Sequence, residues 1–180
     1  MRRWKHEILE EIIRGEIKML KPAQLYREEV SRKYIETWYD PEYMYYSGWF
    51  GTASLNIPDD NYESHHFVSI HNYKVIGYIT YSVNCGTMNA YNFGAISFDK
   101  GNPVFASDLY QVICDIFEKY HMNRVGWGCI VGNPAMRGYK HFIEKHGGRE
   151  CGYRRQVARL MDGKLHDSVK FEILASEFKR

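Results

Sequence analysis

Residues 123–147 read NRVGWGCIVGNPAMRGYKHFIEKHG, and this stretch decides the fold. It begins with a short, mostly apolar run from Val125 to Val131, which is typical of a buried strand. The run is interrupted by Gly132-Asn133-Pro134, and proline is well tolerated in the first turn of a helix. Beyond the proline, apolar side chains recur at spacings of three and four, which predicts an amphipathic helix. These side chains are Met136, Tyr139, Phe142 and Ile143.

Two polar groups of this strand–turn–helix unit are candidates for ligand contact, Asn133 and Tyr139. Ligands in open α/β sheets bind outside the carboxyl ends of the strands, and Asn133 stands at such an end. The ordinary alternative for Asn133 is a cap at the helix start, which is compatible with a ligand contact. For Tyr139 the alternative is a core position with a satisfied hydroxyl, because it lies on the apolar stripe. The sequence leaves both alternatives open.

The chain before this unit predicts an antiparallel meander followed by a helix. Three strand-like segments are joined by short turn-like links, which is the pattern of consecutive hairpins. A break at Asp99–Pro103 ends the meander, and a helix is predicted from Phe105 to Tyr120, with Ser107 and Asp108 placing oxygens near its start. The three strand segments are residues 67–71, 74–84 and 88–98.

The chain after this unit predicts a closing hairpin. Two strand-like runs cover residues 151–161 and 168–178, and Asp162-Gly163 between them is a hairpin-type turn signal. At the other terminus, residues 2–14 have the periodicity of an amphipathic helix, which makes residues 1–22 a helical N-terminal extension. A second helix is predicted from Pro22 to a point before Asp40-Pro41, since the residue before a proline avoids helical geometry. Residues 16–20 fit a strand or a helical continuation equally well.

Bulk composition limits the class of protein. A chain of 180 residues with 44% apolar residues predicts one folded domain with a real core. The net charge of +2 gives no strong field for nucleic acid or an anionic membrane. Because no apolar run is long enough to span a membrane and no signal peptide is recognisable, the expected location is the cytoplasm. Four widely spaced cysteines predict packed thiols, and the isolated His65-His66 pair does not predict a metal site.

Charge and aromatic residues are both unevenly distributed. Residues 34–73 contain six acids and no Lys or Arg, so this segment would favour a cationic ligand if it lined a cleft. Within it, residues 38–50 read WYDPEYMYYSGWF. This aromatic segment is either irregular core or a lid whose aromatic walls face a substrate. The last 44 residues hold eleven bases against six acids.

The order of elements and the residues at their joints resemble the GNAT superfamily of acyl-CoA-dependent N-acetyltransferases. The segment from Asn133 to Tyr139 is similar to the family's N-x-x-(small)-x-x-(Leu/Tyr) motif, although Lys145-His146-Gly147-Gly148 replaces the usual lysine and "GF" that follow. The tail, with its Asp162-Gly163 turn, looks like the family's last hairpin. The resemblance covers residues 66–178, and it implies a mixed, mostly antiparallel α/β sheet of about seven strands flanked by helices.

The family's acyl-CoA loop, Q/R-x-x-G-x-G/A, is the main point of departure. Its glycines let backbone N–H groups close on the pyrophosphate at a helix N-terminus. Pro103 has no N–H to offer, and Val104 cannot adopt glycine-only conformations. The residues that would hold the pyrophosphate here are Lys100, Gly101, Asn102, Val104, Phe105 and Ala106.

The resemblance further implies acetyl-CoA as the co-substrate, with its pantetheine arm between two splayed strands. Backbone groups of Ala95, Ile96, Ser97 and Phe98 would pair with the arm, and Asn133 would bind a pantetheine amide. Tyr139 would protonate the departing thiolate. The acceptor would be the primary amine of a small molecule or peptide, and the acidic segment predicts that it is cationic. Its predicted contacts are Trp38, Tyr46 and Glu63, and the general base stays open among Glu63, His65 and His66.

Two rival functions remain on the sequence alone. The first is a GNAT-like protein without catalysis, in which the altered loop no longer binds CoA and residues 38–50 form a partner or homodimer surface. The second, weaker rival is a nucleic-acid-associated module that uses the basic tail. Its contacts would be Arg149, Arg154, Arg155 and Arg159.

Overall fold

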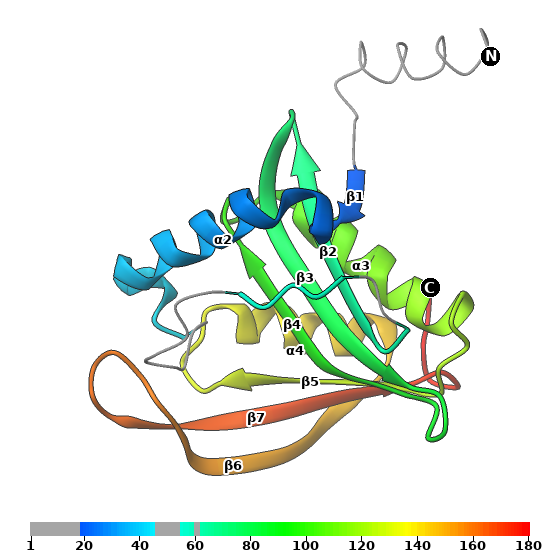
Figure 1. Ribbon diagram of the computed structural model, residues 1–180. Helices are drawn as coiled ribbons and strands as arrows, with labels where there is room; N and C mark the ends of the chain where they lie inside the picture. Colours follow the sequence, from blue (N-terminus) through cyan, green and yellow to red (C-terminus); the bar gives the residue numbers. More distant parts are fainter. Residues whose placement is uncertain (1–18, 46–54, 60–61) are drawn as a thin grey trace, which may run out of the picture.

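A computed structural model describes residues 19–45, 55–59 and 62–180. One seven-stranded sheet crosses this part in the order β1-β2-β3-β4-β5-β7-β6 (Figure 1). Neighbouring strands are antiparallel except for β4 and β5, which run parallel. The predicted mixed, mostly antiparallel sheet is therefore confirmed. Its strands are β1 (Met19–Pro22), β2 (Ser64–His71), β3 (Lys74–Asn84), β4 (Asn89–Ser97), β5 (Arg124–Ile130), β6 (Arg149–Arg159) and β7 (Leu165–Leu174).

Helices cover both faces of the sheet (Figure 1). Helix α2 (Arg27–Glu36) lies on one face, where Val30 belongs to a small apolar cluster with Val68, Tyr78 and Ile96. The opposite face is covered by α3 (Pro103–Glu118) and α4 (Ala135–His146). We refer to these two sides as the α2 face and the α3/α4 face. Short 3-10 turns flank α2 at Ala23–Tyr26, Thr37–Tyr39 and Pro41–Tyr43.

The larger apolar core lies on the α3/α4 face, between the sheet and these two helices. Residues of α3 such as Ile116 pack there with Ile79, Val125 and Phe171 of the strands. The predicted stripe of α4 is confirmed, because its four members all pack against this cluster. They are Met136, Tyr139, Phe142 and Ile143.

The start of α3 differs from the prediction. The helix begins at Pro103, because the Asn102 side chain accepts a hydrogen bond from the Val104 N–H at 2.9 Å and so caps it. Ser107 and Asp108 therefore lie inside the helix. Asp108 is instead buried and accepts a hydrogen bond from the Ser69 hydroxyl on β2 at 2.5 Å.

The closing hairpin turns at Asp162-Gly163 as predicted, but its strands lie closer to the start of the chain. β7 ends at Leu174 rather than near Phe178, because Glu177 donates its N–H to the Leu174 carbonyl and the chain turns there. This turn brings the Phe178 ring to 4.9 Å from that of Phe117. The last residues therefore pack on the α3/α4 face instead of extending the sheet.

Other segments have mixed outcomes. Met19 and Leu20 of the undecided segment belong to a strand, β1, and the second predicted helix is present as a 3-10 turn followed by α2. The predicted helix at residues 2–14 lies outside the described residues, as does Tyr46. No helix in the described part is long and apolar enough to cross a membrane. All four cysteines are free thiols, of which Cys114 and Cys129 are buried.

Candidate active site

Strands β4 and β5 pair only along their first halves. Their register joins Asn89 to Arg124 and Phe93 to Trp127, and no pair follows although β4 continues to Ser97 and β5 to Ile130. The cause lies between Ala90 and Phe93, where the register shifts and Asn92 has a left-handed backbone with φ 51°. Such a bulge bends a strand away from its neighbour. The carboxyl ends of β4 and β5 therefore part, and we call the space between them the gap.

Backbone groups of β4 face this gap. Phe98 donates its N–H to the Ile76 carbonyl of β3 at 2.8 Å, which fixes the phase of hydrogen bonding along the antiparallel pair. Because bonding and non-bonding pairs alternate, the N–H and C=O groups of Ala95 and Ser97 point away from β3, toward β5. Those of Ile96 and Phe98 point back to β3. Of the predicted pantetheine segment, every second residue thus presents its backbone to the gap.

The same alternation applies to β5. Val131 donates its N–H to the Asp167 carbonyl at 2.9 Å, so the backbone groups of Gly128 and Ile130 point away from β7 and toward β4. The Ile130 carbonyl accepts the Asn133 N–H at 3.0 Å. Two strand edges with outward-facing amides thus oppose each other without pairing in the described part of the chain.

Asn133 stands where β5 ends. Its side chain is buried and its Oδ1 accepts the N–H of Ala135 at 2.8 Å, so it caps the start of α4. This confirms the capping interpretation. The carboxamide NH2 of a capping asparagine keeps its donors for another group, so a ligand contact stays a prediction.

Tyr139 lies on the α3/α4 face beside β5. Its half-buried ring packs edge-on against Trp127, with ring centroids 6.0 Å apart, and lies tilted against Phe171 at 5.9 Å. Trp127 is also the last residue of β5 that pairs with β4, so the tyrosine is placed next to the point where the gap begins. Tyr139 thus has the predicted core packing of its ring, and its catalytic role stays a prediction. Its neighbour Lys140 points elsewhere and pairs with Glu150 at 2.9 Å.

Aromatic side chains cross the opening of the gap on the α2 face. The Tyr43 hydroxyl donates to the Ser97 carbonyl at 2.9 Å, and its ring is buried. Tyr45 lies against Gly132, where an added Cβ would stand 3.1 Å from the phenol oxygen, and is edge-on to His166 at 6.1 Å. The buried Tyr43 ring fits the core interpretation of the aromatic segment, and the lid stays a prediction, since residues 46–50 lie outside the described part. His166 was not predicted beside this segment, and Tyr45 only as one member of residues 38–50.

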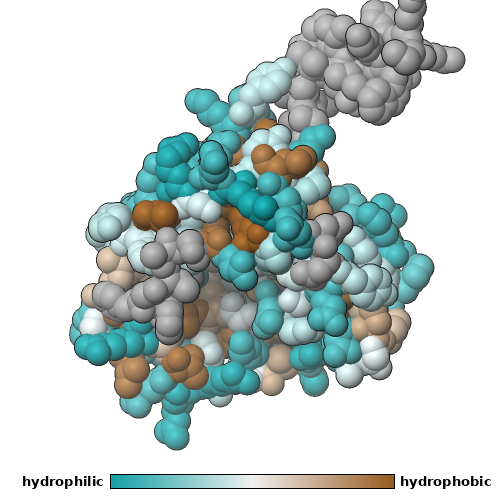
Figure 2. All heavy atoms as spheres, viewed as in Figure 1, coloured by the Kyte–Doolittle hydropathy of each residue, from teal (hydrophilic) through white to brown (hydrophobic). Residues whose placement is uncertain are grey.

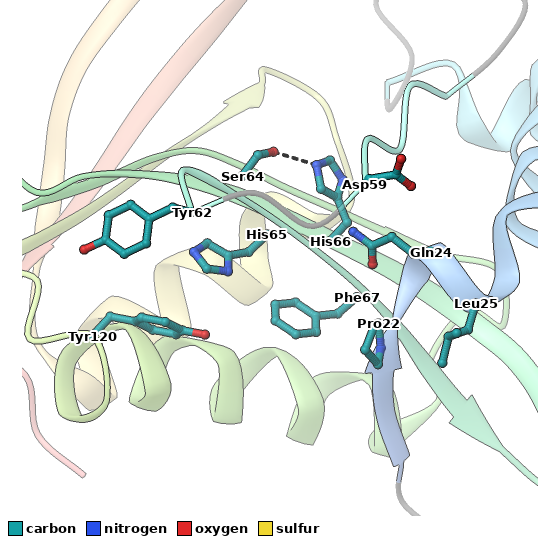
Figure 3. A pocket seen from close by; sticks show the side chains of 10 residues that line it. All are labelled: Pro22, Gln24, Leu25, Asp59, Tyr62, Ser64, His65, His66, Phe67 and Tyr120. Atoms are coloured by element: carbon teal, nitrogen blue, oxygen red, sulfur yellow. Dashed lines mark hydrogen bonds between the residues drawn. The ribbon is translucent and has the colours of Figure 1, made fainter.

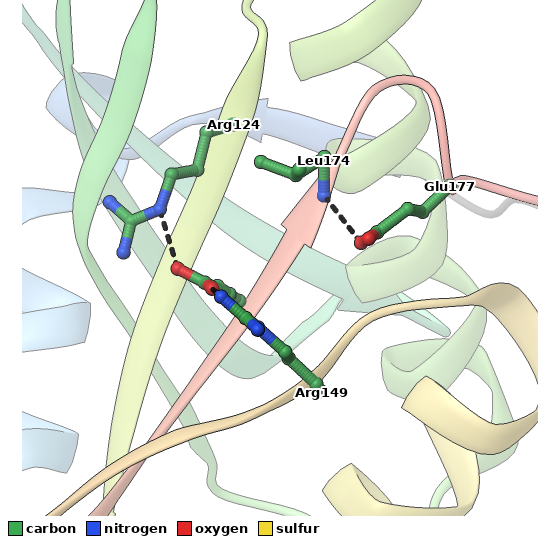
Figure 4. Close-up of polar contacts among 5 residues, drawn as sticks. Arg124, Arg149, Leu174 and Glu177 are labelled. Atoms are coloured by element: carbon green, nitrogen blue, oxygen red, sulfur yellow. Dashed lines mark hydrogen bonds and ion pairs between the residues drawn. The ribbon is translucent and has the colours of Figure 1, made fainter.

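A buried acid joins the strands on the closed side of β5. The Glu172 carboxylate of β7 accepts hydrogen bonds from Arg124 of β5 at 2.8 Å and Arg149 of β6 at 2.9 Å (Figure 4). The hydrogen bond from Arg124, partly opposed by burial and helped by Arg149, lowers the pKa of Glu172 below its usual range. We call these three residues the arginine clamp. They hold β5, β7 and β6 together while β4 departs.

Solved structures share this fold. A probable GNAT-family acetyltransferase from Chromobacterium violaceum superimposes with a TM-score of 0.66 at 16% identity, covering 91% of this chain and 85% of its own. Spermidine N-acetyltransferase from Vibrio cholerae, described as dodecameric, gives 0.56 at 19% identity over 64% of this chain and 67% of its own. RimJ from Mycobacterium smegmatis in complex with CoA-disulfide gives 0.54 at 18% identity over 63% and 54%.

The chain has the fold of the GNAT acetyltransferases. No family model matches the sequence, and no curated protein matches it significantly in sequence. For several of the solved structures, this chain spans less than two thirds of their length. At these identities the likeness establishes the fold, and the chemistry has to be argued from the residues of this chain.

The predicted pyrophosphate loop is largely occupied by internal contacts. Lys100 pairs with Glu42 at 2.5 Å and sits 3.9 Å above the Tyr43 ring. Burial opposes its charge, but the hydrogen bond that Lys100 donates to Glu42 raises the pKa of Lys100 above its usual value. Asn102 and the Val104 N–H bind each other. The open parts are Gly101, with φ 78° and no atom within 4 Å of an added Cβ, and the backbone N–H group of Phe105.

Predicted substrate residues do not gather at the opening. Trp38 packs edge-on against Tyr34 at the end of α2, at 6.2 Å. Glu63 precedes β2, which starts at the end of the sheet opposite to Asn133, since β2, β4 and β5 all run the same way. His65 and His66 on β2 share that distant end.

Those histidines line a separate hollow of about 670 Å³ (Figure 3). Its walls include Tyr120 at the end of α3, whose ring lies 4.9 Å from that of His65. Burial, followed by the neighbouring His65, lowers the pKa of His66, which is hydrogen-bonded to Ser64 at 2.6 Å. The structure thus places all three candidate bases away from the gap.

The acids of the segment at residues 34–73 are dispersed. Asp59 pairs with Arg27 at 2.5 Å and Glu36 with Arg32 at 2.9 Å. Asp40 accepts the N–H of Glu42 and caps a 3-10 turn. Among the described residues these acids form no common acidic wall, and no group of three or more potential metal ligands occurs.

Proposed function

We propose that this protein transfers an acetyl group from acetyl-CoA to a primary amine. The observation that carries the proposal is the gap between β4 and β5, whose two edges present backbone amides with no strand between them. Unpaired strand edges bind extended chains through such groups, and the pantetheine arm is an extended chain with two amides. The GNAT fold, and its occurrence in a protein solved with a CoA derivative, support the same conclusion.

The residues around the gap suit direct transfer. An N–H that faces the gap, such as that of Ser97, would donate to the thioester oxygen as negative charge develops there. The amine nitrogen forms its bond to the carbonyl carbon while the carbon–sulfur bond breaks. The departing thiolate takes a proton from the Tyr139 hydroxyl, and the amine releases its proton to water or a base. Asn133, at the end of β5, would bind a pantetheine amide through its NH2 group.

A covalent route through a cysteine is disfavoured by burial. Cys129 is the cysteine on β5, and burial raises the pKa of its thiol to about 11. A thiol of that kind is almost entirely protonated at neutral pH and is a poor nucleophile. Direct attack by the amine on the thioester therefore fits the residues present.

A non-catalytic GNAT-like module is the alternative that a specific observation favours. Lys100 is held by Glu42, and the first available N–H of α3 is held by Asn102. Both groups would otherwise bind a pyrophosphate. The nucleic-acid alternative has less support, since Arg149 is engaged by Glu172 in the arginine clamp. The cationic acceptor expected from the sequence also has little support from the dispersed acids, although one protein of the same fold is a spermidine acetyltransferase.

Ligand-dependent melting separates these functions. If the gap binds acetyl-CoA, a saturating concentration should raise the melting temperature by about 5 °C or more. Free CoA tests whether the pantetheine arm binds without its acetyl group. Adenosine diphosphate tests whether the pyrophosphate binds without the arm. A melting temperature that does not change with millimolar acetyl-CoA would rule out the transferase and leave the non-catalytic module. Salt-dependent binding to DNA or RNA would instead support the nucleic-acid module.

A further inference from the structure

On the α2 face, a lysine of β7 reaches over β5, the strand that borders the gap. Lys170 of β7 is paired with Gly128 of β5 on one side and Gly152 of β6 on the other. Glycine on both neighbouring strands leaves the lysine stem room to lie along the sheet. Figure 2 shows this face hollowed between the α2 region and the β6–β7 hairpin.

The lysine points toward the gap. If Gly128 carried a Cβ, that atom would lie 2.7 Å from the Lys170 Nζ, closer than to Cδ at 3.2 Å or Cε at 3.3 Å. The side chain therefore runs from β7 to a position over Gly128 of β5, and β4 is the next strand in that direction. Because the backbone of Gly128 faces the gap, the ammonium group is placed above the edge of the gap.

The charge of this ammonium is not neutralised within the described residues. Glu172, on the same face of β7, is held by Arg124 and Arg149. Asp162 binds His166 at 2.9 Å, and Asp167 accepts hydrogen bonds from Tyr153 and from the Gln156 N–H. Lys170 forms no ion pair in the described part of the chain. His166 and Arg124, which flank it on this face, add no negative charge.

We infer that the acceptor is an amine bearing an anionic oxygen group, a carboxylate or a phosphate, that Lys170 binds. The inference rests on the proposed transferase function and names its substrate class. Tyr139 lies on the α3/α4 face, so the amine approaches the gap from the α2 face, where Lys170 stands. A carboxylate beside the amine would form a charge-assisted hydrogen bond with the ammonium. A purely cationic acceptor would meet like charge at the same place.

The lysine also favours the reactive form of the acceptor. An amine attacks only when it is neutral, and a nearby positive charge lowers the pKa of an amine. Lys170 would thus orient the acceptor through its anionic group and help its nitrogen to lose a proton. Polyamines would have neither advantage, since they carry no anionic group and add charges that the lysine repels.

Matched amine pairs test this inference. Lysine and 1,5-diaminopentane differ by one carboxylate, as do tyrosine and tyramine, while 2-aminoethyl phosphate and 2-aminoethanol differ by a phosphate. The 180-residue chain should show a kcat/KM about 10- to 100-fold higher for the anionic member of the carboxylate or the phosphate pairs. A preference in the carboxylate pairs or in the phosphate pair identifies which anionic group Lys170 binds.

Two variants locate the preference at Lys170. Lys170→Met keeps the length of the side chain without the charge and should abolish the preference mainly through KM. Gly128→Ala keeps the charge but places a methyl group where the ammonium lies, so it should weaken the preference as well. Lys119→Met, on an exposed residue at the end of α3, is the matched control and should keep it.

The outcomes distinguish a failure of this inference from a failure of the proposed transferase function. Acetylation of both members of each pair at equal rates, or a preference for the diamine, would overturn the inference and leave the transferase intact. So would a preference that survives in Lys170→Met. Failure of acetyl-CoA to raise the melting temperature would remove the transferase and the inference together.

Discussion

The two edges of β5 behave in opposite ways. Toward β7 the strand is paired from Arg124 to Ile130, and toward β4 it is paired only as far as Trp127. The closed edge is reinforced by the arginine clamp, while the open edge begins at the bulge around Asn92. A continuous sheet can thus leave a slot between two of its strands, provided that one side of the central strand is held firmly enough for the other to separate.

The open edge should matter for rate more than for stability. Tyr139→Phe removes the proposed proton donor and keeps the ring against Trp127, so kcat should fall about 100-fold or more while the melting temperature changes little. Steady-state kinetics with acetyl-CoA and a reactive amine measure this. Tyr91→Phe, on the paired half of β4, should leave kcat unchanged. Equal activity of the Tyr139 variant and the parent would remove the tyrosine from the mechanism.

The closed edge should matter for stability. Glu172→Gln removes the charge that Arg124 and Arg149 share, and because both guanidinium groups keep some water, the loss should be about 2 kcal/mol. Chemical denaturation at neutral pH gives the value. Glu150→Gln breaks the exposed ion pair between Glu150 of β6 and Lys140 of α4, and should cost less than about 0.5 kcal/mol. Similar losses for the two variants would show that the clamp does not hold the edge closed.

Substitutions at Asn92 test whether the bulge is what separates β4 from β5. Asn92 has φ 51°, which asparagine tolerates and a β-branched residue does not, so Asn92→Val should destabilise the fold by about 1–2 kcal/mol. Asn92→Gly should be close to neutral, because glycine adopts this conformation freely. Urea denaturation of both variants measures the difference. If valine is tolerated as well as glycine, the left-handed backbone is not what separates β4 from β5.

Local sequence patterns predicted the helix and the turn near the gap, whereas contacts between distant segments determine the gap itself. The stripe of α4 and the Asp162-Gly163 turn follow from spacing and turn chemistry within one segment, and both were confirmed. Asn133 was predicted at the end of β5 for the same reason. The bulge at Asn92 has no such signal, because it arises where two strand registers meet.

Charge was the least predictable part of the site. Six acids in one segment indicated a cationic ligand, yet Asp59, Glu36 and Glu42 each pair with a base. Lys170 and Glu172 lie on one face because side chains alternate along β7, but only the neighbouring strands determine which of the two charges is neutralised. Glu63 and the two histidines were grouped with the site as candidate bases, but they lie at or just before the start of β2, at the other end of the sheet.

The smallest expected effect is the pH dependence of stability that Glu172 gives to the closed edge of β5. The pKa of Glu172 is lowered in the folded protein, chiefly by Arg124, so its stabilising contribution is complete above the ordinary glutamate pKa of about 4.3 and is lost as pH falls through the lower folded value. Between about pH 5 and pH 3, the parent should therefore lose stability more steeply than Glu172→Gln, whose amide does not titrate. Denaturation midpoints across that range measure the two slopes, with Glu150→Gln as the control that keeps the clamp. Parallel curves for the parent and Glu172→Gln would mean that the carboxylate is not charged and paired in the way the clamp requires.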